Sequence, residues 1–257
     1  MKRLAFLLLV LICFTACRKI WDKIHDGNEQ PTAPSCRVVG WTYGEFNTSE
    51  GTVPINTNIS YDSNGNPISV QANDYATNPN ATNDKFEYDS QNRLILFDHR
   101  PVNGYTKYFY QGNSKYPVRD STYSVSDEVF VSHFNYDTKK RISGITTYLA
   151  RTWQGPVTNP DTTVVNFYYD ANGNRQTVGQ PVIEYNTSKF SIYSLHPTWK
   201  LVFANYSVNC TTAAITFNEQ GLPLKFNSMA IDPSYSQQFY GSYYTNDGIG
   251  YECSPTN

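Results

Sequence analysis

The chain has 257 residues, and its 20 Lys and Arg side chains nearly balance 22 Asp and Glu, for a formal net charge of −2 at pH 7. This balance supplies no basic field for nucleic acid, so we expect no nucleic-acid partner. The 21 Tyr and 14 Phe residues favour β-strands, because aromatic side chains suit a pleated and half-buried surface.

The first residues have the three zones of a secretory signal. A positively charged start is followed by an apolar run over residues 4–14 and then by small residues before Cys17. The apolar run is about half the ~20 residues that a membrane-spanning helix needs. The stretch resembles the bacterial lipobox, although Phe14 stands where that pattern prefers Leu. We therefore predict a signal peptide over residues 1–16 and lipid on Cys17, with ordinary signal cleavage as the alternative.

Residues 17–35 mix charged residues with glycine and proline, which predicts a lipidated tether. In lipoproteins of the Bacteroidota an acidic run after the cysteine resembles a surface-export signal. Arg18 and Lys19 occupy that place here. We expect a cell-envelope protein held to the outer membrane by its lipid, and the side of the membrane that it faces stays open.

Three cysteines remain after the signal peptide and the lipidated residue, namely Cys36, Cys210 and Cys253. An odd number in an oxidising compartment allows three single pairings, and three free thiols are the alternative. A bridge between Cys36 and Cys253 would tie the two ends of the body together, and the chain-entropy model assigns about 5 kcal/mol to so long a loop. The sequence contains no Cys-x-x-Cys pair and its four His are scattered, so we expect no metal site.

A short motif recurs along the body and is the main structural signal. Its four clear copies begin with a Tyr-Asp pair, at Tyr61, Tyr88, Tyr136 and Tyr169. Two weaker copies begin with an aromatic residue followed by Gln or Asn, at Tyr110 and Phe217. The residues before each copy alternate between aromatic and polar, as in a strand with one buried face. The Asp accepts backbone hydrogen bonds, and the Gly or Asn that follows tolerates a positive φ. Each copy therefore predicts a β-hairpin.

The hairpins make the body, residues 36–257, a single all-β domain. Closely spaced short strands with turn signals between them are typical of antiparallel sandwiches, barrels and curled sheets. Residues 183–199 are the exception, because Asn186 and Ser188 favour the start of a short helix there. The predicted strands cover residues 36–44, 56–61, 67–72, 84–89, 93–98, 105–110, 117–124, 128–136, 141–148, 162–170, 174–178, 200–206, 211–218, 222–229, 236–244 and 248–253.

The Tyr-Asp-x-x-Gly-Asn copies are similar to the YD repeats of RHS-type proteins. Together with the lipobox and residues 183–205, which contain Leu195-His196-Pro197, they resemble small Bacteroidota lipoproteins of an uncharacterised domain family with a porin-like β fold. The resemblance covers roughly residues 36–253. It implies an antiparallel meander that curls into a barrel-like sheet, and it implies no activity. The chain departs from RHS-type proteins in length, since their shells use many more repeats and carry a toxin.

The porin-like resemblance does not by itself predict a pore. Strands of membrane barrels have about 9–11 residues and an apolar lipid-facing side. Most strands predicted here are shorter, and Ser132, Asn135 and Asn166 would interrupt an apolar belt. We therefore expect a soluble, lipid-anchored β body.

No group of residues makes a recognisable catalytic, cofactor or metal site. Asp98-His99-Arg100 could hold an acid–base pair, but the sequence places no nucleophile or metal within its reach. The Asp-x-Asn-Gly copies lack the Gly and Glu positions of a calcium-binding loop. The Gly-x-Ser-x-Gly, His-Glu-x-x-His and phosphate-loop motifs are absent from the sequence.

These observations favour a non-enzymatic binding or interaction module, with the membrane as one partner through Cys17. A glycan-binding or carbohydrate-processing lipoprotein is the first alternative, with Trp41, Trp153 and Trp199 as candidate glycan contacts. Hydrolysis would also need two carboxylates brought together from distant positions. A structural envelope protein is the second alternative. The partner of the body is then a glycan or another protein, and no cofactor is expected.

Overall fold

The computed structural model describes residues 33–48, 51–74, 76, 78, 81–100, 104–226 and 246–254. The chain divides into two compact units, Met1–Thr32 and Ala33–Asn257, and every described residue belongs to the second unit. The predicted signal peptide, Cys17 and the tether up to residue 32 therefore lie outside the described residues. Among the residues that are described, no helix is long and apolar enough to cross a membrane.

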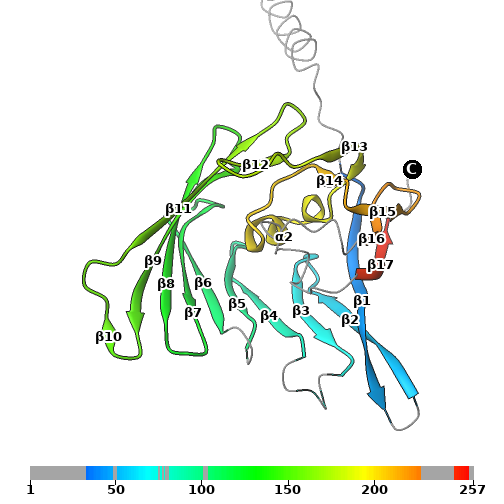
Figure 1. Cartoon of the computed structure of the whole chain (residues 1–257), viewed down its shortest axis with the longest axis horizontal. Helices are drawn as coiled ribbons and strands as arrows, with labels where there is room; N and C mark the ends of the chain where they lie inside the picture. Colours follow the sequence, from blue (N-terminus) through cyan, green and yellow to red (C-terminus); the bar gives the residue numbers. More distant parts are fainter. Residues whose placement is uncertain are drawn as a thin grey trace, which may run out of the picture. The chain divides into compact units, whose positions relative to one another are not determined.

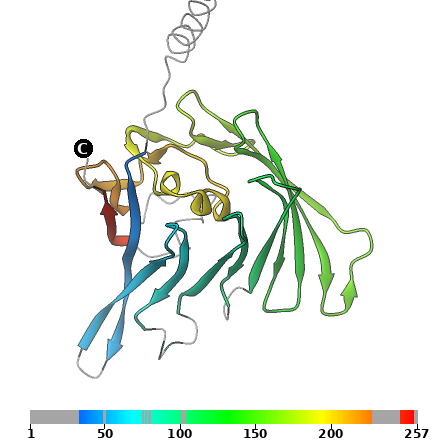
Figure 2. The same ribbon diagram turned by 180° about the vertical axis from the view of Figure 1, so that it is seen from behind.

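The second unit is dominated by one antiparallel sheet of 13 strands, which confirms the predicted all-β meander. Its order is β12-β11-β9-β8-β7-β6-β5-β4-β3-β2-β1-β17, and β10 pairs with β9 beside this path. The sheet curls but stays open, and within the described residues β12 and β17 are its two ends (Figures 1 and 2). The strands are β1 (Cys36–Thr48), β2 (Gly51–Tyr61), β3 (Pro67–Ala72), β4 (Asn83–Tyr88), β5 (Leu94–Asp98), β6 (Tyr105–Tyr110), β7 (Pro117–Tyr123), β8 (Val129–Tyr136), β9 (Ile142–Thr152), β10 (Gly155–Pro156), β11 (Thr162–Tyr169), β12 (Arg175–Thr177) and β17 (Asn246–Cys253).

The segment of residues 178–226 follows β12, and its two short helices lie on the inner side of the curled sheet (Figures 1 and 2). It contains two small hairpins and two short helices: β13 (Tyr185–Phe190) with β14 (Asn209–Thr211), β15 (Ala214–Phe217) with β16 (Pro223–Phe226), η1 (Ile192–Leu195) and α2 (Pro197–Val202).

The helices of this segment begin later than the sequence predicts. The helix expected over residues 183–199 is replaced at its start by β13, because those residues pair with β14. Ser191 caps η1, and the ring of His196 accepts the N–H of Thr198 and caps α2. Pro197 occupies the first turn of α2, where a missing N–H costs nothing, so the strand expected over residues 200–206 is instead helical at its start.

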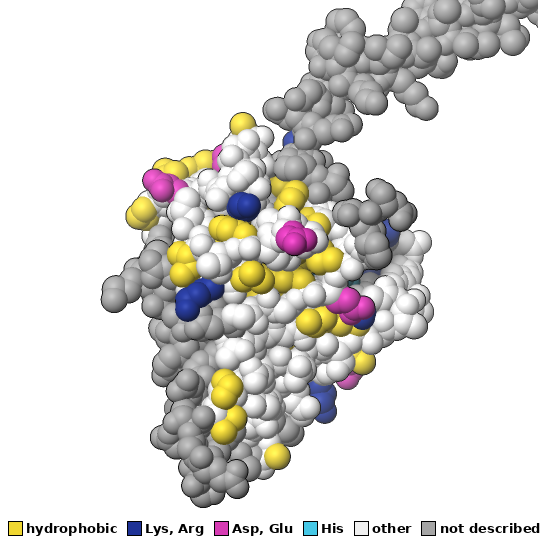
Figure 3. Space-filling model, turned by 90° about the vertical axis from the view of Figure 1, so that its right-hand side faces the viewer, with side chains coloured by type: hydrophobic (Ala, Val, Ile, Leu, Met, Phe, Trp, Pro, Cys, Tyr) yellow, Lys and Arg dark blue, Asp and Glu magenta, His cyan; other side chains and the backbone are white. Residues whose placement is uncertain are grey.

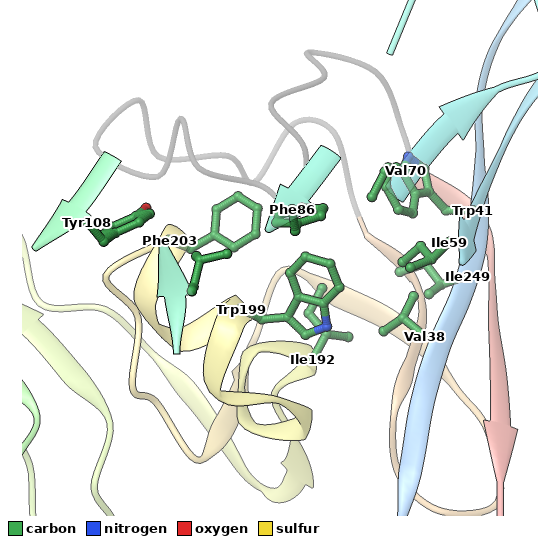
Figure 4. Close-up of a cluster of buried hydrophobic side chains, with 11 residues drawn as sticks. Val38, Trp41, Ile59, Val70, Phe86, Tyr108, Ile192, Trp199, Phe203 and Ile249 are labelled. Carbon is green, nitrogen blue, oxygen red and sulfur yellow. The ribbon is translucent and has the colours of Figure 1, made fainter. Parts of the chain in front are cut away.

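The hydrophobic core lies between the inner face of the sheet and the two short helices. Alternate residues of a strand face inward, as in β4, where Asp84 and Phe86 are buried while Lys85 and Glu87 are exposed. The ring of Phe86 packs edge-on against Trp199 of α2, with 5.6 Å between centroids (Figure 4). The cluster comprises Val38, Trp41, Ile59, Val70, Phe86, Leu94, Tyr108, Ile192, Trp199, Phe203 and Ile249.

The repeated motif forms the turns at one end of the strands. In the first copy, Asp62 Oδ1 accepts the N–H groups of Asn64 and Asn66, each at 2.8 Å. Asp89, Asp137 and Asp170 hold their turns by the same bond to the residue four positions later. The third residue after each Asp has a positive φ, and these residues are Gly65, Asn92, Lys140 and Gly173. The carboxylates of the four Asp residues are therefore already hydrogen-bonded within their own turns.

Candidate binding face on the outer side of the sheet

The structure contains one of the three cysteine pairings that the sequence leaves open. Cys36 and Cys253 form a disulfide between β1 and β17, with their Cα atoms 4.0 Å apart. The pair joins residues separated by 217 positions and fastens the first strand of the body to the last. Cys210 is a buried free thiol, and burial raises its pKa to about 12. The thiol therefore stays protonated and unreactive at neutral pH.

The three tryptophans considered as glycan contacts lie in two different environments. Trp41 and Trp199 are only 3% and 1% exposed, because both belong to the core. Trp153 lies in the turn between β9 and β10 and is 74% exposed. Burial removes Trp41 and Trp199 as candidate glycan contacts and leaves Trp153 as the one exposed candidate.

The acid–base candidate Asp98-His99-Arg100 lies at the end of β5 and is held by an internal ion pair. Asp98 accepts hydrogen bonds from the backbone N–H, Nε and terminal nitrogen of Arg100, and these bonds lower the pKa of the carboxyl. Burial lowers the pKa of His99, whose ring stacks on Phe97 at 4.7 Å. Asp98 is thus fixed as an anion by its own neighbour, which fits a structural role.

Two inner-face carboxyls have strongly raised pKa values. Burial raises the pKa of Asp84 to about 7, with Asp98 adding to the shift, and burial raises that of Asp120 to about 6. Asp84 is on β4 and Asp120 on β7, so three strand spacings, or roughly 14 Å, separate them. Carboxyl pairs of glycosidases are only about 5 to 9.5 Å apart. This pair therefore does not fit sugar hydrolysis.

A different group of residues forms a continuous surface on the outer side of β6, β7, β8 and β9. On β6, Thr106 and Tyr108 are buried on the inner side, so Tyr105, Lys107 and Phe109 face outward. The strand register extends this face across the sheet, since residues directly opposite in neighbouring strands share a side. We call it the outer aromatic face, and its members are Tyr105, Lys107, Phe109, Arg119, Tyr123, His133 and Tyr148.

Contacts within the outer aromatic face hold its cations beside aromatic rings. Tyr105 and Tyr123 stack with their centroids 4.6 Å apart, and Lys107 Nζ lies within 5.6 Å of the first ring and 5.9 Å of the second. Arg119 lies over Phe109, with 3.9 Å from its Cζ atom to the ring centroid. These cation–π contacts orient the charged groups while leaving Lys107 exposed.

A second stacked pair extends the same surface to β9. The ring of His133 lies 6.1 Å from that of Tyr148, and His133 is exposed on the strand beside Arg119. Strand pairing thus brings together rings from four consecutive strands.

The charge of the outer aromatic face has one sign. Strands β6, β7, β8 and β9 contain a single carboxylate, Asp120, and it lies on the inner side opposite Tyr108. Lys107 and Arg119 are therefore not neutralised by an acid on their own face of these strands. A guanidinium and an ammonium beside flat rings suit a ligand that carries carboxylate or phosphate groups on an apolar frame. Sugar acids have this chemistry.

Sequence reasoning did not single out this face, although its alternation is visible in Tyr105-Thr106-Lys107-Tyr108. The missing information is the register, which decides that Arg119 lies opposite Phe109. Metal chemistry gains no support: among the described residues, no group of three or more His, Cys, Asp or Glu side chains could hold an ion.

Comparisons with known proteins give likenesses of shape. No family model and no curated protein matches the chain. A porin-like protein from Bacteroides uniformis is similar in structure, with 12% identity, a TM-score of 0.41, and coverage of 76% of this chain and 88% of that one. A chain of the TcdB2-TccC3-Cdc42 complex has 10% identity and a TM-score of 0.31, with 72% of this chain covering 10% of that one.

Proposed function

We propose that the chain is a lipid-anchored cell-envelope protein whose β body is a non-enzymatic binding module for an anionic glycan. The observation that carries the proposal is the outer aromatic face, on which Lys107 and Arg119 lie beside aromatic rings and to which β6, β7, β8 and β9 contribute no carboxylate. Asp98, opposite Tyr105 on the neighbouring β5, is already paired with Arg100. Stacked rings offer flat apolar surface to sugar rings, and the cations pair with the acidic groups.

The carboxyl groups considered above do not form a pair suited to sugar hydrolysis. Asp84 and Asp120 lie too far apart to act on one glycosidic bond, and Asp98 is engaged by Arg100. The outer side needs no proton transfer to work, since ion pairing and stacking suffice for recognition. Because such contacts are exposed, we expect weak individual contributions that add along a repeating polymer.

The binding experiment titrates the full chain, purified in detergent, with polygalacturonate at low salt, and with neutral dextran as the control ligand. We expect binding to the acidic polymer alone, and weakening as salt screens the charges. Lys107→Gln combined with Arg119→Gln should weaken binding by about tenfold or more, since each lost ionic contact contributes up to ~1 kcal/mol. Lys139→Gln combined with Lys140→Gln makes the same charge change at an exposed turn and should leave binding almost unchanged.

Two results would overturn the binding proposal. One is equal affinity for dextran and polygalacturonate, or no affinity for either. The other is an equal loss in the Lys139→Gln/Lys140→Gln variant and the Lys107→Gln/Arg119→Gln variant, because net charge rather than the outer aromatic face would then control binding.

The anchor has its own test, because Cys17 lies outside the described residues. Cells that express the full chain are fed an alkyne fatty acid, and the chain is expected to become labelled. Cys17→Ser should abolish labelling and release the protein from the detergent phase, because acyl chains contribute ~0.8 kcal/mol per buried CH₂. Labelling that persists in the Cys17→Ser variant would exclude the lipid at this position.

A further inference from the structure

Among the described residues, part of one edge of β11 has no neighbouring strand. β11 pairs with β9 from Thr162 to Asn166 on one side, but β12 covers only Phe167 to Tyr169 on the other. Residues 162–165 are all exposed, including Val164 at 56% and Val165 at 37%.

The register shows which backbone groups of this edge point outward. The N–H of Val178 donates to the carbonyl of Asn166 on the β12 side, so even-numbered residues of β11 direct their backbone groups to that side. The N–H and C=O groups of Thr162 and Val164 therefore face away from β9, beyond the end of β12. Two backbone donors and two backbone acceptors therefore point outward in a row, as at the unpaired edge of a sheet.

The opposite end of the sheet differs in both charge and cover. β17 carries Glu252, which pairs with Arg37 of β1 at 2.6 Å. The hairpin of β15 and β16 lies beside β17, where Tyr251 donates a hydrogen bond to Pro223. Figure 3 shows this side of the molecule, on which hydrophobic and charged side chains are interleaved. Charged and covered edges discourage strand pairing. Residues 162–165 carry no charge, and no strand in the described part of the chain covers their outer edge.

We propose that residues 162–165 of β11 pair with the same residues of a second copy of this chain, in antiparallel register. Thr162 then lies opposite the partner's Val164, and Thr163 lies opposite the partner's Thr163. Four backbone hydrogen bonds form through the outward groups of Thr162 and Val164 on each copy. A second copy is the occupant that these residues fit, because the segment is uncharged and opposes no like charges when paired with itself.

The proposed pairing is two-fold, because both copies use the same residues, and such a contact closes on itself. At the other end of the sheet, within the described residues, β16 lies against β17. Val178, which is 58% exposed and bonded beside the free segment, would gain cover from the partner strand. The inference stands apart from glycan binding, because β11 contributes no residue to the outer aromatic face.

A register-specific crosslink tests the proposal on the purified full chain. In an antiparallel pair, residues opposite each other at a non-hydrogen-bonded position have Cα atoms about 4.5 Å apart, which suits a disulfide. Thr163→Cys should form a covalent dimer under mild oxidation, seen on a non-reducing gel, whereas Thr162→Cys should not because it faces the partner's Val164. Each variant is compared with the unmodified chain, in which Cys36 and Cys253 are paired and Cys210 is buried.

A charge on the edge provides the second arm. Val164→Lys should shift the sedimenting mass from dimer to monomer. It should also reduce the yield of the Thr163→Cys crosslink at least tenfold. Val118→Lys is the matched control, because Val118 is an exposed valine, at 40%, on a strand paired on both sides. Three results would each overturn the proposal. They are a monomer at all concentrations, equal crosslinking of Thr162→Cys and Thr163→Cys, and a dimer that persists in the Val164→Lys variant.

Discussion

The hydroxyl of Tyr136 donates a hydrogen bond to the carbonyl oxygen of Pro117, 2.8 Å away. Tyr136 ends β8 and Pro117 opens β7, so the bond joins two consecutive turns of the repeat. The same relationship recurs in the pairs Tyr61–Val38, Tyr88–Pro67, Tyr110–Leu94, Tyr169–Ile142 and Tyr251–Pro223. In the five copies that begin with tyrosine, the hydroxyl is therefore a staple between hairpins, and the copy that begins with Phe217 has no hydroxyl to form it.

Loss of one staple should destabilise the sheet by a modest amount. Tyr136→Phe keeps the ring but removes the donor to the Pro117 carbonyl, and we expect a loss of about 1–2 kcal/mol in the free energy of unfolding. Tyr168→Phe is the control, because Tyr168 is 49% exposed on β11 and should change stability by less than about 0.5 kcal/mol. Denaturant unfolding measures both, and equal losses in the two variants would contradict the staple.

The disulfide between Cys36 and Cys253 should stabilise the body through the unfolded state. Its two residues are separated by 217 positions, so the chain-entropy model predicts a loss of about 5 kcal/mol when Cys36→Ser and Cys253→Ser are combined. The parent chain should also lose stability in dithiothreitol, while the double variant should not respond to it. A double variant that still loses stability in dithiothreitol would place the reducible bond elsewhere.

The buried carboxyl of Asp84 should make stability fall as pH rises. Its pKa is about 7 in the folded chain, against 3.8 for an exposed carboxyl, so the folded state binds the proton more tightly. The contribution of Asp84 to the free energy of unfolding is then greatest below pH 4. It is lost between about pH 4 and 7 and amounts to as much as about 4 kcal/mol. Asp84→Asn, which needs no proton, should flatten this part of the pH profile. An unchanged slope in thermal or denaturant unfolding would argue against the raised pKa.

The two environments of the tryptophans predict opposite sensitivities. Trp199→Ala should cost about 3–5 kcal/mol, because Trp199 is 1% exposed and packs on Phe86. Trp153→Ala removes a side chain that is 74% exposed and should change stability by less than about 0.5 kcal/mol. The comparison uses the same substitution at both sites, so similar losses would mean that Trp153 is covered in solution.

The sequence by itself determined the hairpins. A Tyr-Asp pair followed by a residue that tolerates positive φ encodes a turn through contacts within about five positions, and alternation assigns the two faces of the adjoining strand. These are local relationships, so the antiparallel meander was predictable from them. The helices were predicted less well, because the pairing of β13 with β14 joins residues that are distant along the chain and overrides the local preference of Asn186 and Ser188.

Only the tertiary structure decided which residues meet. The selection of Cys253 rather than Cys210 as the partner of Cys36 depends on β17 adding to β1. The burial of Trp199 depends on α2 returning to the inner side of the sheet. The outer aromatic face depends on the exact register between β6, β7, β8 and β9, and the open edge of β11 depends on how far β12 extends along it. Local sequence patterns repeat in every hairpin and so cannot specify which hairpin lies beside which, and that is the physical reason for the division.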